Sequence, residues 1–217
     1  MLSIVDYSEL IKSIPVYDQS ARIKRKVWEK ILYDDKSRIE NTIFGDKEEV
    51  ELSRADVLSE NDTVKKIVMV LMWGYPTGGR GSNIENTLNE IVKLSRFLSK
   101  VKDKDLTKAD ANNLINDFKD IRGLGFSTWS KFLYFFSVTI DSRKCQIFDQ
   151  KIVDSLNKKQ FDELGIQKWK QNIDCYYKYI GLVDDLSKQI DVLPEQVEVF
   201  LFYFNLYYKF RYEDTLL

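Results

Sequence analysis

An aspartate stands directly in front of a helical pattern, where the backbone would fix its carboxylate. Asp149 precedes residues 150–156, in which Ile152, Val153 and Leu156 recur at helical spacing. An N-cap carboxylate accepts backbone N–H groups and faces the positive end of the helix dipole, so it stays ionised. A fixed negative charge of this kind suits the electrostatic stabilisation of a cation during a reaction. The plainer interpretation is that Asp149 only caps its helix.

Two glycines, two positions apart, lie between two helical patterns. The segment is Ile121-Arg122-Gly123-Leu124-Gly125, and it has the form of a helix-hairpin-helix. Small residues let the hairpin backbone approach a phosphate. The N–H groups of the turn and of the following helix N-terminus form a positive cradle. The segment therefore predicts a phosphate contact, and an ordinary corner between two helices is the alternative.

A lysine follows the hairpin within the next predicted helix. Lys131 is four residues after Ser127 and lies on the same helix face, and helical side chains lean toward the N-terminus. Its amine can therefore reach back to the position of Ser127. A lysine becomes a nucleophile when burial lowers its pKa. The alternative is a lysine whose amine extends to solvent or to a phosphate.

Helices must position these residues, and the sequence supplies the patterns for them. Only 9 glycines and 3 prolines interrupt the 217 residues, which favours helices over a sandwich or a barrel. The helix after the hairpin is apolar nearly all round and is expected to be buried. The predicted helices cover 64–73 after Asp62 or Thr63, 84–98 after Ser82 or Asn83, 108–120 after Thr107, 128–138 from Ser127 or Thr128, 150–156, 167–180, and a last one from Pro194.

Composition excludes several kinds of enzyme. The chain has no histidine, which removes serine–histidine–aspartate catalysis and the commonest zinc and iron ligand sets. Its two cysteines, Cys145 and Cys175, are too few for a disulfide framework or a four-thiolate cluster, so we expect unpaired packing residues. We therefore expect no metal and no cofactor. The cysteine usage fits a reducing cytoplasm, and without a run of about 18 apolar residues we expect no membrane segment.

Charge is nearly balanced overall but not locally. The 33 Lys and Arg residues face 34 Asp and Glu residues, which excludes a highly basic coat protein of nucleic acid. Residues 22–30 nevertheless hold five bases against Glu29, and residues 119–151 hold six bases against three acids. Each run could form a basic binding face. A solvated helix face is the usual interpretation of such a run taken alone.

The hairpin and the segment after it resemble one enzyme superfamily. The matching residues are Gly123-Leu124-Gly125-Phe126-Ser127-Thr128-Trp129 and Ile147-Phe148-Asp149-Gln150-Lys151-Ile152. A hairpin, one buried helix, a short loop and a capping Asp follow one another as in the helix-hairpin-helix DNA glycosylases. The segment is most similar to bacterial members of the 8-oxoguanine glycosylase type, specifically over residues 114–156. The four-cysteine motif of the iron–sulfur members is absent, so the resemblance is to the branch without a cluster.

The resemblance implies an all-α, two-lobed fold with a cleft between the lobes. Residues 1–217 would form a single glycosylase-like unit, with N-terminal helices from 1–60 and C-terminal helices from 157–217 packed around the core. The helix-hairpin-helix and the catalytic aspartate segment would occupy 107–156. The implied partner is double-stranded DNA, bound by a monomer.

The resemblance also implies roles for individual residues. Asp149 would stabilise the positive charge that builds on the sugar as the N-glycosidic bond breaks, and would activate water. Bifunctional relatives carry a lysine two residues after the second hairpin glycine; Ser127 stands there, which favours water as nucleophile over Lys131. The DNA backbone would be bound by Gly123, Leu124, Gly125, Phe126, Ser127 and Lys151. The base pocket or wedge would hold Trp73, Tyr75, Arg80 and Asn83, with a Trp73 anchored in the core as the alternative.

The expected function is excision of a damaged or modified base, by default of the 8-oxoguanine type, by hydrolysis that leaves an abasic site. Lyase activity through Lys131 is the open alternative. The other candidates are a glycosylase for a hypermodified base of phage DNA in antiviral defence, a non-catalytic helix-hairpin-helix DNA-binding module, and a helical scaffold that binds no DNA. Asp149→Asn separates the two glycosylase candidates, whose alkali-labile sites it would abolish, from a binding module, which never forms abasic sites and would keep its affinity for a duplex. A scaffold would lack any steeply salt-dependent affinity for DNA.

Overall fold

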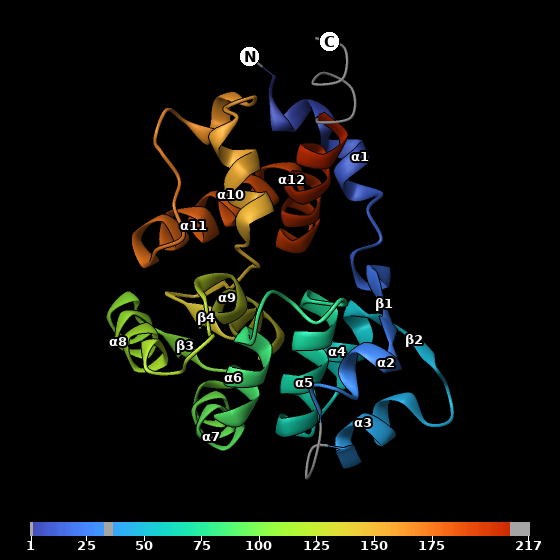
Figure 1. Cartoon of the computed structure of the whole chain (residues 1–217). Helices are drawn as coiled ribbons and strands as arrows, with labels where there is room; N and C mark the ends of the chain where they lie inside the picture. The colour runs from blue at the N-terminus through green and yellow to red at the C-terminus, as the bar shows by residue number, and fades with distance from the viewer. Residues whose placement is uncertain (1, 33–36, 209–217) are drawn as a thin grey trace.

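The chain folds into two helical lobes joined by extended segments (Figure 1). The computed structural model describes residues 2–32 and 37–208. The smaller lobe combines the start of the chain with its last helices, and the larger lobe holds the residues between 20 and 148. The mostly helical, two-lobed architecture that the sequence predicts is confirmed. None of the described helices is long and apolar enough to cross a membrane.

The larger lobe contains most of the helices. Its elements are β1 (Ser20–Lys24), α2 (Arg25–Trp28), α3 (Ser37–Phe44), β2 (Glu49–Ser53), α4 (Arg54–Ser59), α5 (Thr63–Gly74), α6 (Asn83–Asn89), α7 (Ile91–Val101), β3 (Asp105–Leu106), α8 (Lys108–Lys119), α9 (Phe126–Phe135), β4 (Thr139–Ile140) and β5 (Arg143–Lys144). The smaller lobe contains α1 (Ser8–Lys12), α10 (Gln150–Asn157), α11 (Ile173–Ile190), α12 (Pro194–Tyr208) and short 3-10 turns at Ile4–Tyr7, Val16–Asp18 and Asp162–Leu164. The elements within residues 1–60 are shared between the two lobes, because the chain leaves the smaller lobe near residue 19.

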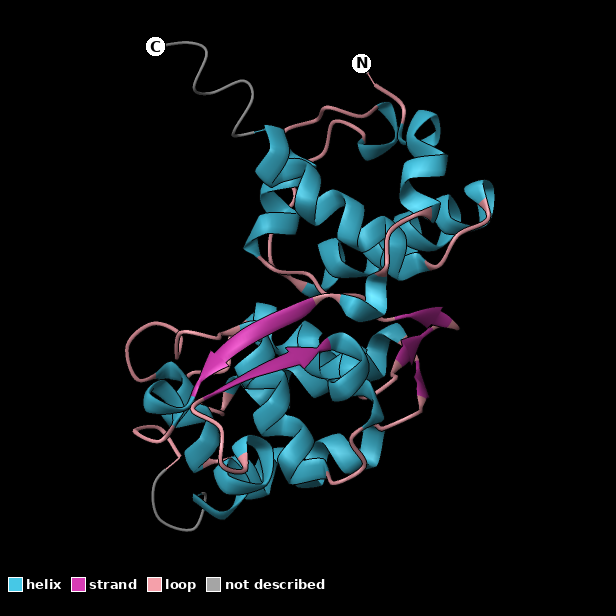
Figure 2. Ribbon diagram, turned by 90° about the vertical axis from the view of Figure 1, so that its right-hand side faces the viewer, coloured by secondary structure: helices cyan, strands magenta, loops and turns pink. Residues whose placement is uncertain are grey.

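Two small sheets supplement the helices (Figure 2). Strands β1 and β2 are antiparallel, with Ile23 opposite Val50, while β3 pairs in parallel with β4 and β4 pairs antiparallel with β5. In β1 and β2 a buried apolar residue, Ile23 or Leu52, alternates with charged residues that face solvent. This period of two is typical of strands with one covered face. The sequence analysis did not predict these strands.

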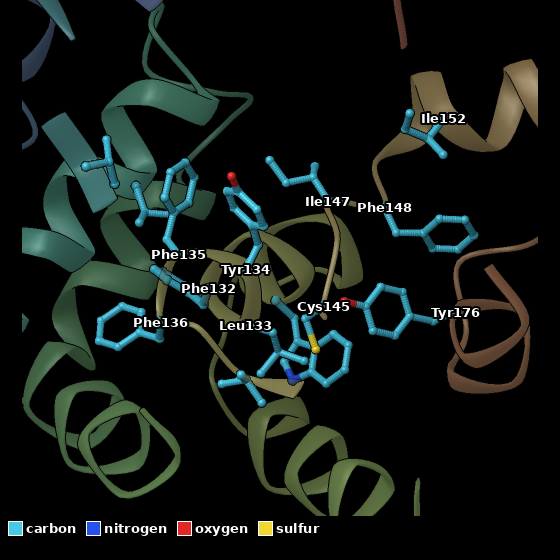
Figure 3. Packing of buried hydrophobic residues seen from close by; sticks show 14 of the residues in the cluster. Phe132, Leu133, Tyr134, Phe135, Phe136, Cys145, Ile147, Phe148, Ile152 and Tyr176 are labelled. Atoms are coloured by element: carbon cyan, nitrogen blue, oxygen red, sulfur yellow. The ribbon is translucent and has the colours of Figure 1, made fainter. Parts of the chain in front are cut away.

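Helix α9 forms the centre of the larger lobe. Every residue from Thr128 to Phe135 is buried, as its apolar pattern predicts. Figure 3 shows Phe132 and Phe135 among the packed side chains, with Tyr134 on the side of α9 that faces the smaller lobe. Burying several large aromatic residues on one helix makes it a rigid platform. Whatever α9 presents at its first turn is therefore fixed in place.

Three predicted helix caps are confirmed. The side chain of Asp62 accepts the N–H of Lys65 at 2.7 Å, and Asp149 accepts the N–H of Ile152 at 3.1 Å. Thr107 forms a reciprocal capping box with Asp110. Each contact joins residues three positions apart, so the sequence alone suffices to predict it.

Other helix boundaries differ from the prediction. Helix α9 begins at Phe126, because Gly125 is extended and its carbonyl accepts the N–H groups of Thr128 and Trp129, both at 3.0 Å. Neither Ser127 nor Thr128 caps it. The predicted helix over 84–98 is two helices, α6 and α7, and no side chain caps α6. The helix expected over 167–180 begins at 173, since Asn172 caps it there.

Candidate active site

The amine of Lys131 lies inside the protein, beside a hydroxyl and a carboxylate. Its Nζ donates a hydrogen bond to Ser127 Oγ at 3.0 Å and lies 3.8 Å from Asp149 Oδ2. The side chain of Lys131 is only 4% exposed. The prediction that this lysine leans back one helical turn to Ser127 is therefore confirmed. The alternative, an amine extended to solvent, is wrong, because the chain is enclosed by Gly74 and Tyr75.

The two carboxylate oxygens of Asp149 have different partners, one in the backbone and one in a side chain. Oδ1 accepts the N–H of Ile152 and so caps α10, while Oδ2 faces the amine of Lys131. The side chain is 18% exposed. The carboxylate therefore lies neither in bulk solvent nor in packed hydrocarbon. A carboxylate held in this way can stabilise a cation placed beside it.

Three hydroxyl groups hold the loop segment of residues 145–149, which presents Asp149. Ser130 Oγ on α9 accepts the N–H of Phe148 at 3.0 Å. From α11, the hydroxyls of Tyr176 and Tyr179 donate to the carbonyls of Gln146 and Ile147 at 3.0 and 3.2 Å. Figure 3 shows this segment, with Ile147 and Phe148, between α9 and the helix that carries Tyr176. The sequence analysis missed these positioning residues, because contacts over 18 to 32 positions leave no local pattern.

A pocket of about 580 Å³ lies in front of Lys131. Its walls are the α5–α6 loop (residues 75–82), the α8–α9 turn (residues 120–125), the first turn of α9 and the start of α10. The predicted site residues that line it are Tyr75, Arg80, Asn83, Gly123, Gly125, Phe126, Ser127 and Lys151. Gln171, which the sequence analysis did not single out, also lines it. The volume is within the range of sites for small molecules.

The pocket wall covers the lysine amine. The ring of Tyr75 lies 5.4 Å from Lys131 Nζ, and the Tyr75 hydroxyl is hydrogen-bonded to Thr128 Oγ1 at 2.7 Å. Ser127, which accepts from the same amine, also lines the pocket. The amine is thus separated from the pocket by one aromatic ring and one hydroxyl. Neither Lys131 nor Asp149 lines the pocket itself.

Trp73 and Leu124 differ from their predicted roles. The indole of Trp73 donates to the carbonyl of Gln19 at 3.2 Å and packs edge-on against Phe135, away from the pocket. The alternative of an anchored tryptophan is therefore correct. The N–H of Leu124 is used within the turn, where it donates to the carbonyl of Ile121 at 3.2 Å. It is not available to a phosphate.

The first two N–H groups of α9 point out of the helix without a protein acceptor. Among the described residues, no acceptor is found for the N–H of Phe126 or of Ser127. Both residues line the pocket. Free N–H groups at a helix start attract anions, and the helix dipole reinforces the attraction. The pocket therefore has an anion-binding edge next to the α8–α9 turn.

Two glycines allow the close packing around the site. Gly123 has a φ of +89°, and a Cβ there would lie 2.2 Å from the carbonyl oxygen of Asn83. The α8–α9 turn therefore packs directly against the start of α6. A Cβ on Gly74 would lie 2.9 Å from Lys131 Cδ. Gly74 thus leaves the space through which the lysine chain passes.

A buried ion pair connects the two lobes behind the site. Arg54 on α4 donates to Glu198 on α12 at 2.9 Å, and both side chains are at most 2% exposed. Burial raises the pKa of Glu198, an effect that Arg54 opposes and that the negative charge of Asp149 increases. Lys131 also acts on Glu198, in the opposite sense. The charges of the site and of the lobe interface are therefore coupled.

One family model matches most of the chain. The family is described as "Putative 8-oxoguanine DNA glycosylase OGG-like protein", and the match covers residues 14–202. No curated protein and no solved structure matches the chain. Within the described residues, no cluster of three histidine, cysteine, aspartate or glutamate side chains could hold a metal ion.

Proposed function

The chain belongs to this OGG-like family of DNA glycosylases, and from that premise we propose that it excises an 8-oxopurine of the 8-oxoguanine type from double-stranded DNA as a step of DNA repair. One observation carries the proposal. Buried Lys131 and half-buried Asp149 form a pair beside a pocket whose wall includes the α8–α9 turn, which resembles a helix-hairpin-helix. The pocket would take the extruded nucleotide, and the pair would act on its sugar.

Asp149 supplies electrostatic stabilisation. Departure of the base leaves positive charge on the sugar, and a carboxylate about 4 Å away at an effective dielectric near 20 attracts it by about 4 kcal/mol. That corresponds to about a thousandfold in rate. Because the cap to α10 fixes Oδ1, the carboxylate needs no reorganisation as the charge develops.

Lys131 is proposed as the nucleophile in place of the water that the sequence favours, because its amine lies 3.0 Å from Ser127 Oγ. Its amine, as the free base, attacks C1′ of the sugar while the bond from C1′ to the base nitrogen breaks and its electron pair leaves with the base. Asp149, 3.8 Å away, can accept the amine proton and pass it to the departing base. Ser127 occupies the place of the usual lysine, and the amine of Lys131 reaches that place from one turn further on. Trapping with borohydride tests this step: a covalent complex with DNA is expected, and Lys131→Gln should abolish it.

The helix-hairpin-helix would hold the DNA backbone. The free N–H groups of Phe126 and Ser127 suit a phosphate beside the target nucleotide. Arg80 and Asn83 are exposed at the pocket rim and would fill the gap left by the extruded base, with Tyr75 stacking on that base. Lys151 would contact a neighbouring phosphate. The arrangement needs no sequence-specific contact, and one copy of the chain supplies every group named.

A panel of duplexes tests the function. Each carries one modified base, including 8-oxoguanine, an alkylated purine and a hypermodified pyrimidine of phage DNA, and the release of free base is measured under single-turnover conditions. We expect release from the 8-oxoguanine duplex to be fastest. Fastest release of the hypermodified base would instead support antiviral defence. Tight binding of every duplex without any release would overturn the enzymatic proposal and favour a DNA-binding module.

A further inference from the structure

The basic run of residues 22–30 is the strongest charge pattern that the site does not use. The fold pairs two of its five bases with carboxylates. Arg22 pairs with Glu49 at 3.5 Å, and Arg25 pairs with Glu40 at 3.4 Å. Lys24 on β1 lies opposite Glu49 in the β1–β2 register, but that carboxylate is already paired with Arg22.

Two of the remaining bases, Lys26 and Lys30, are exposed on and just after α2. Neither forms an ion pair with any residue in the part of the chain that the structure describes. Glu29 lies between them in the sequence, so the local excess is one positive charge from three charged side chains. The structure thus reduces the run to a small, unpaired basic surface on and just after α2.

This surface adjoins the pocket. A Cβ on Gly78 of the α5–α6 loop would lie 3.2 Å from both Val27 and Ile31, so the loop packs directly on α2. The far end of the same loop meets the α8–α9 turn, where Asn83 contacts Gly123. Segment α2, the loop and the turn therefore form one continuous surface.

Arg80 lies within that loop, between the two contacts. It is exposed, and it lines the pocket rim. Arg80 thus places positive charge at the pocket rim, and Lys26 places it on α2. Helix α2 and the α8–α9 turn lie on opposite sides of the α5–α6 loop. A polyanion that enters the pocket would pass over both charges.

We propose that Lys26 and Lys30 form a second phosphate-binding surface, the α2 surface, which holds the duplex beyond the target nucleotide on the side opposite the hairpin. The inference rests on the proposed function only in that the same duplex occupies the pocket. Two flexible ammonium groups suit phosphates as point charges and do not select a sequence. Their role is to fix the direction in which the duplex crosses the loop.

Salt dependence of binding tests the α2 surface. The affinity for an unmodified duplex, which needs no catalysis, is measured between 50 mM and 200 mM salt for the wild type and for Lys26→Gln/Lys30→Gln. Each lost phosphate contact lowers the slope of log affinity against log salt by about 0.9. Two lost contacts therefore reduce the slope by about 1.8 and weaken binding by about 60-fold near 0.1 M salt.

A charge-matched variant is the control. Arg96→Gln/Lys100→Gln removes two exposed bases from α7, beside residues 61–64 at the start of α5, whereas the pocket lies at the end of that helix. The control variant changes the net charge by the same amount as the α2 variant. Because its two side chains lie away from the pocket, we expect its slope of log affinity against log salt to match that of the wild type. Thermal unfolding of both variants should also match the wild type, since all four side chains are exposed.

The outcomes separate this proposal from the proposed function. A slope that falls only in the α2 variant supports the α2 surface, even if no duplex of the panel ever loses a base. An unchanged slope in that variant overturns it, even if 8-oxoguanine is released. Equal losses in both variants would also overturn it, because net charge alone would then account for the effect. A wild type without affinity for duplex DNA would overturn both proposals.

Discussion

Gly74→Ala should shift the side chain of Lys131 and slow base release while changing the stability of the fold very little. The added Cβ would lie 2.9 Å from Lys131 Cδ, whereas ordinary contacts begin at 3.4 Å. The lysine chain must therefore shift by about 0.5 Å or more, as the difference between these two distances requires. Because its amine is held at 3.0 Å from Ser127 and 3.8 Å from Asp149, that shift changes both contacts.

The expected loss is large in rate and small in stability. A misplacement of about 1 Å at a reacting group costs about 100-fold in rate, so a shift of half that size should cost about 10-fold, and a larger shift more. Gly74 is the last residue of α5, and alanine is favoured over glycine in a helix by up to about 1 kcal/mol. This gain offsets part of the strain, so the free energy of unfolding should change by no more than about 1 kcal/mol.

The assay is single-turnover release of base from an 8-oxoguanine duplex, with denaturant unfolding measured in parallel. Gly181→Ala on α11 is the matched control, since its Cβ meets only the mobile end of Arg143, at 3.2 Å, far from the pocket. We expect the control to keep the wild-type rate. If Gly74→Ala also kept that rate, the position of Lys131 would not matter to the reaction and the assignment would fail.

Three further predictions concern the framework of the site. Gly123→Ala should destabilise the protein by about 2 kcal/mol or more and weaken DNA binding, because its φ is +89° and Asn83 leaves no space for a Cβ; an unchanged melting temperature would contradict this. Ser130→Ala leaves the buried N–H of Phe148 without an acceptor, so urea unfolding should detect a loss of about 1–3 kcal/mol and base release should slow. Burial raises the pKa of Cys145 from 9.0 to about 12, so its contribution to stability is complete below pH 9 and is lost as the pH rises to 12. Over that interval the free energy of unfolding should fall about 1.4 kcal/mol per pH unit more steeply in the wild type than in Cys145→Val, and parallel curves would refute the prediction.

Contacts within one helical turn were predictable from the sequence. The cap by Asp149 joins residues three positions apart, and the reach of Lys131 to Ser127 spans four. Both follow from helix geometry and from the lean of side chains toward the N-terminus. The buried character of α9 follows in the same way from its apolar pattern.

Contacts between distant segments were not predictable. The orientation of Trp73 depends on the carbonyl of Gln19, 54 positions away, and nothing in the loop sequence indicates it. The pair of Arg54 and Glu198 spans 144 positions. Such contacts depend on how the lobes pack, and a single sequence carries no local signal for that packing.

Which bases of the run at residues 22–30 are free to bind a partner was not predictable either, for a different reason. A count of charges in the sequence gives every base equal weight. In the fold, Arg22 pairs with Glu49 across β1 and β2 and Arg25 pairs with Glu40, so these two bases are already neutralised. Among the described residues, Lys24, Lys26 and Lys30 form no ion pair, and Lys26 and Lys30 lie together on and just after α2. A run of like charges therefore indicates a binding surface only after its internal pairs have been subtracted.

The most direct test of the central claim compares Asp149→Asn with the wild type on one 8-oxoguanine duplex. Base release is followed under single-turnover conditions, and affinity for the same duplex is measured alongside. Asparagine can still accept the N–H of Ile152 and cap α10, so the fold and the binding should persist. The account predicts a fall in rate of about a thousandfold or more, as expected for loss of a carboxylate beside a sugar cation. A variant that releases base within tenfold of the wild-type rate would contradict it.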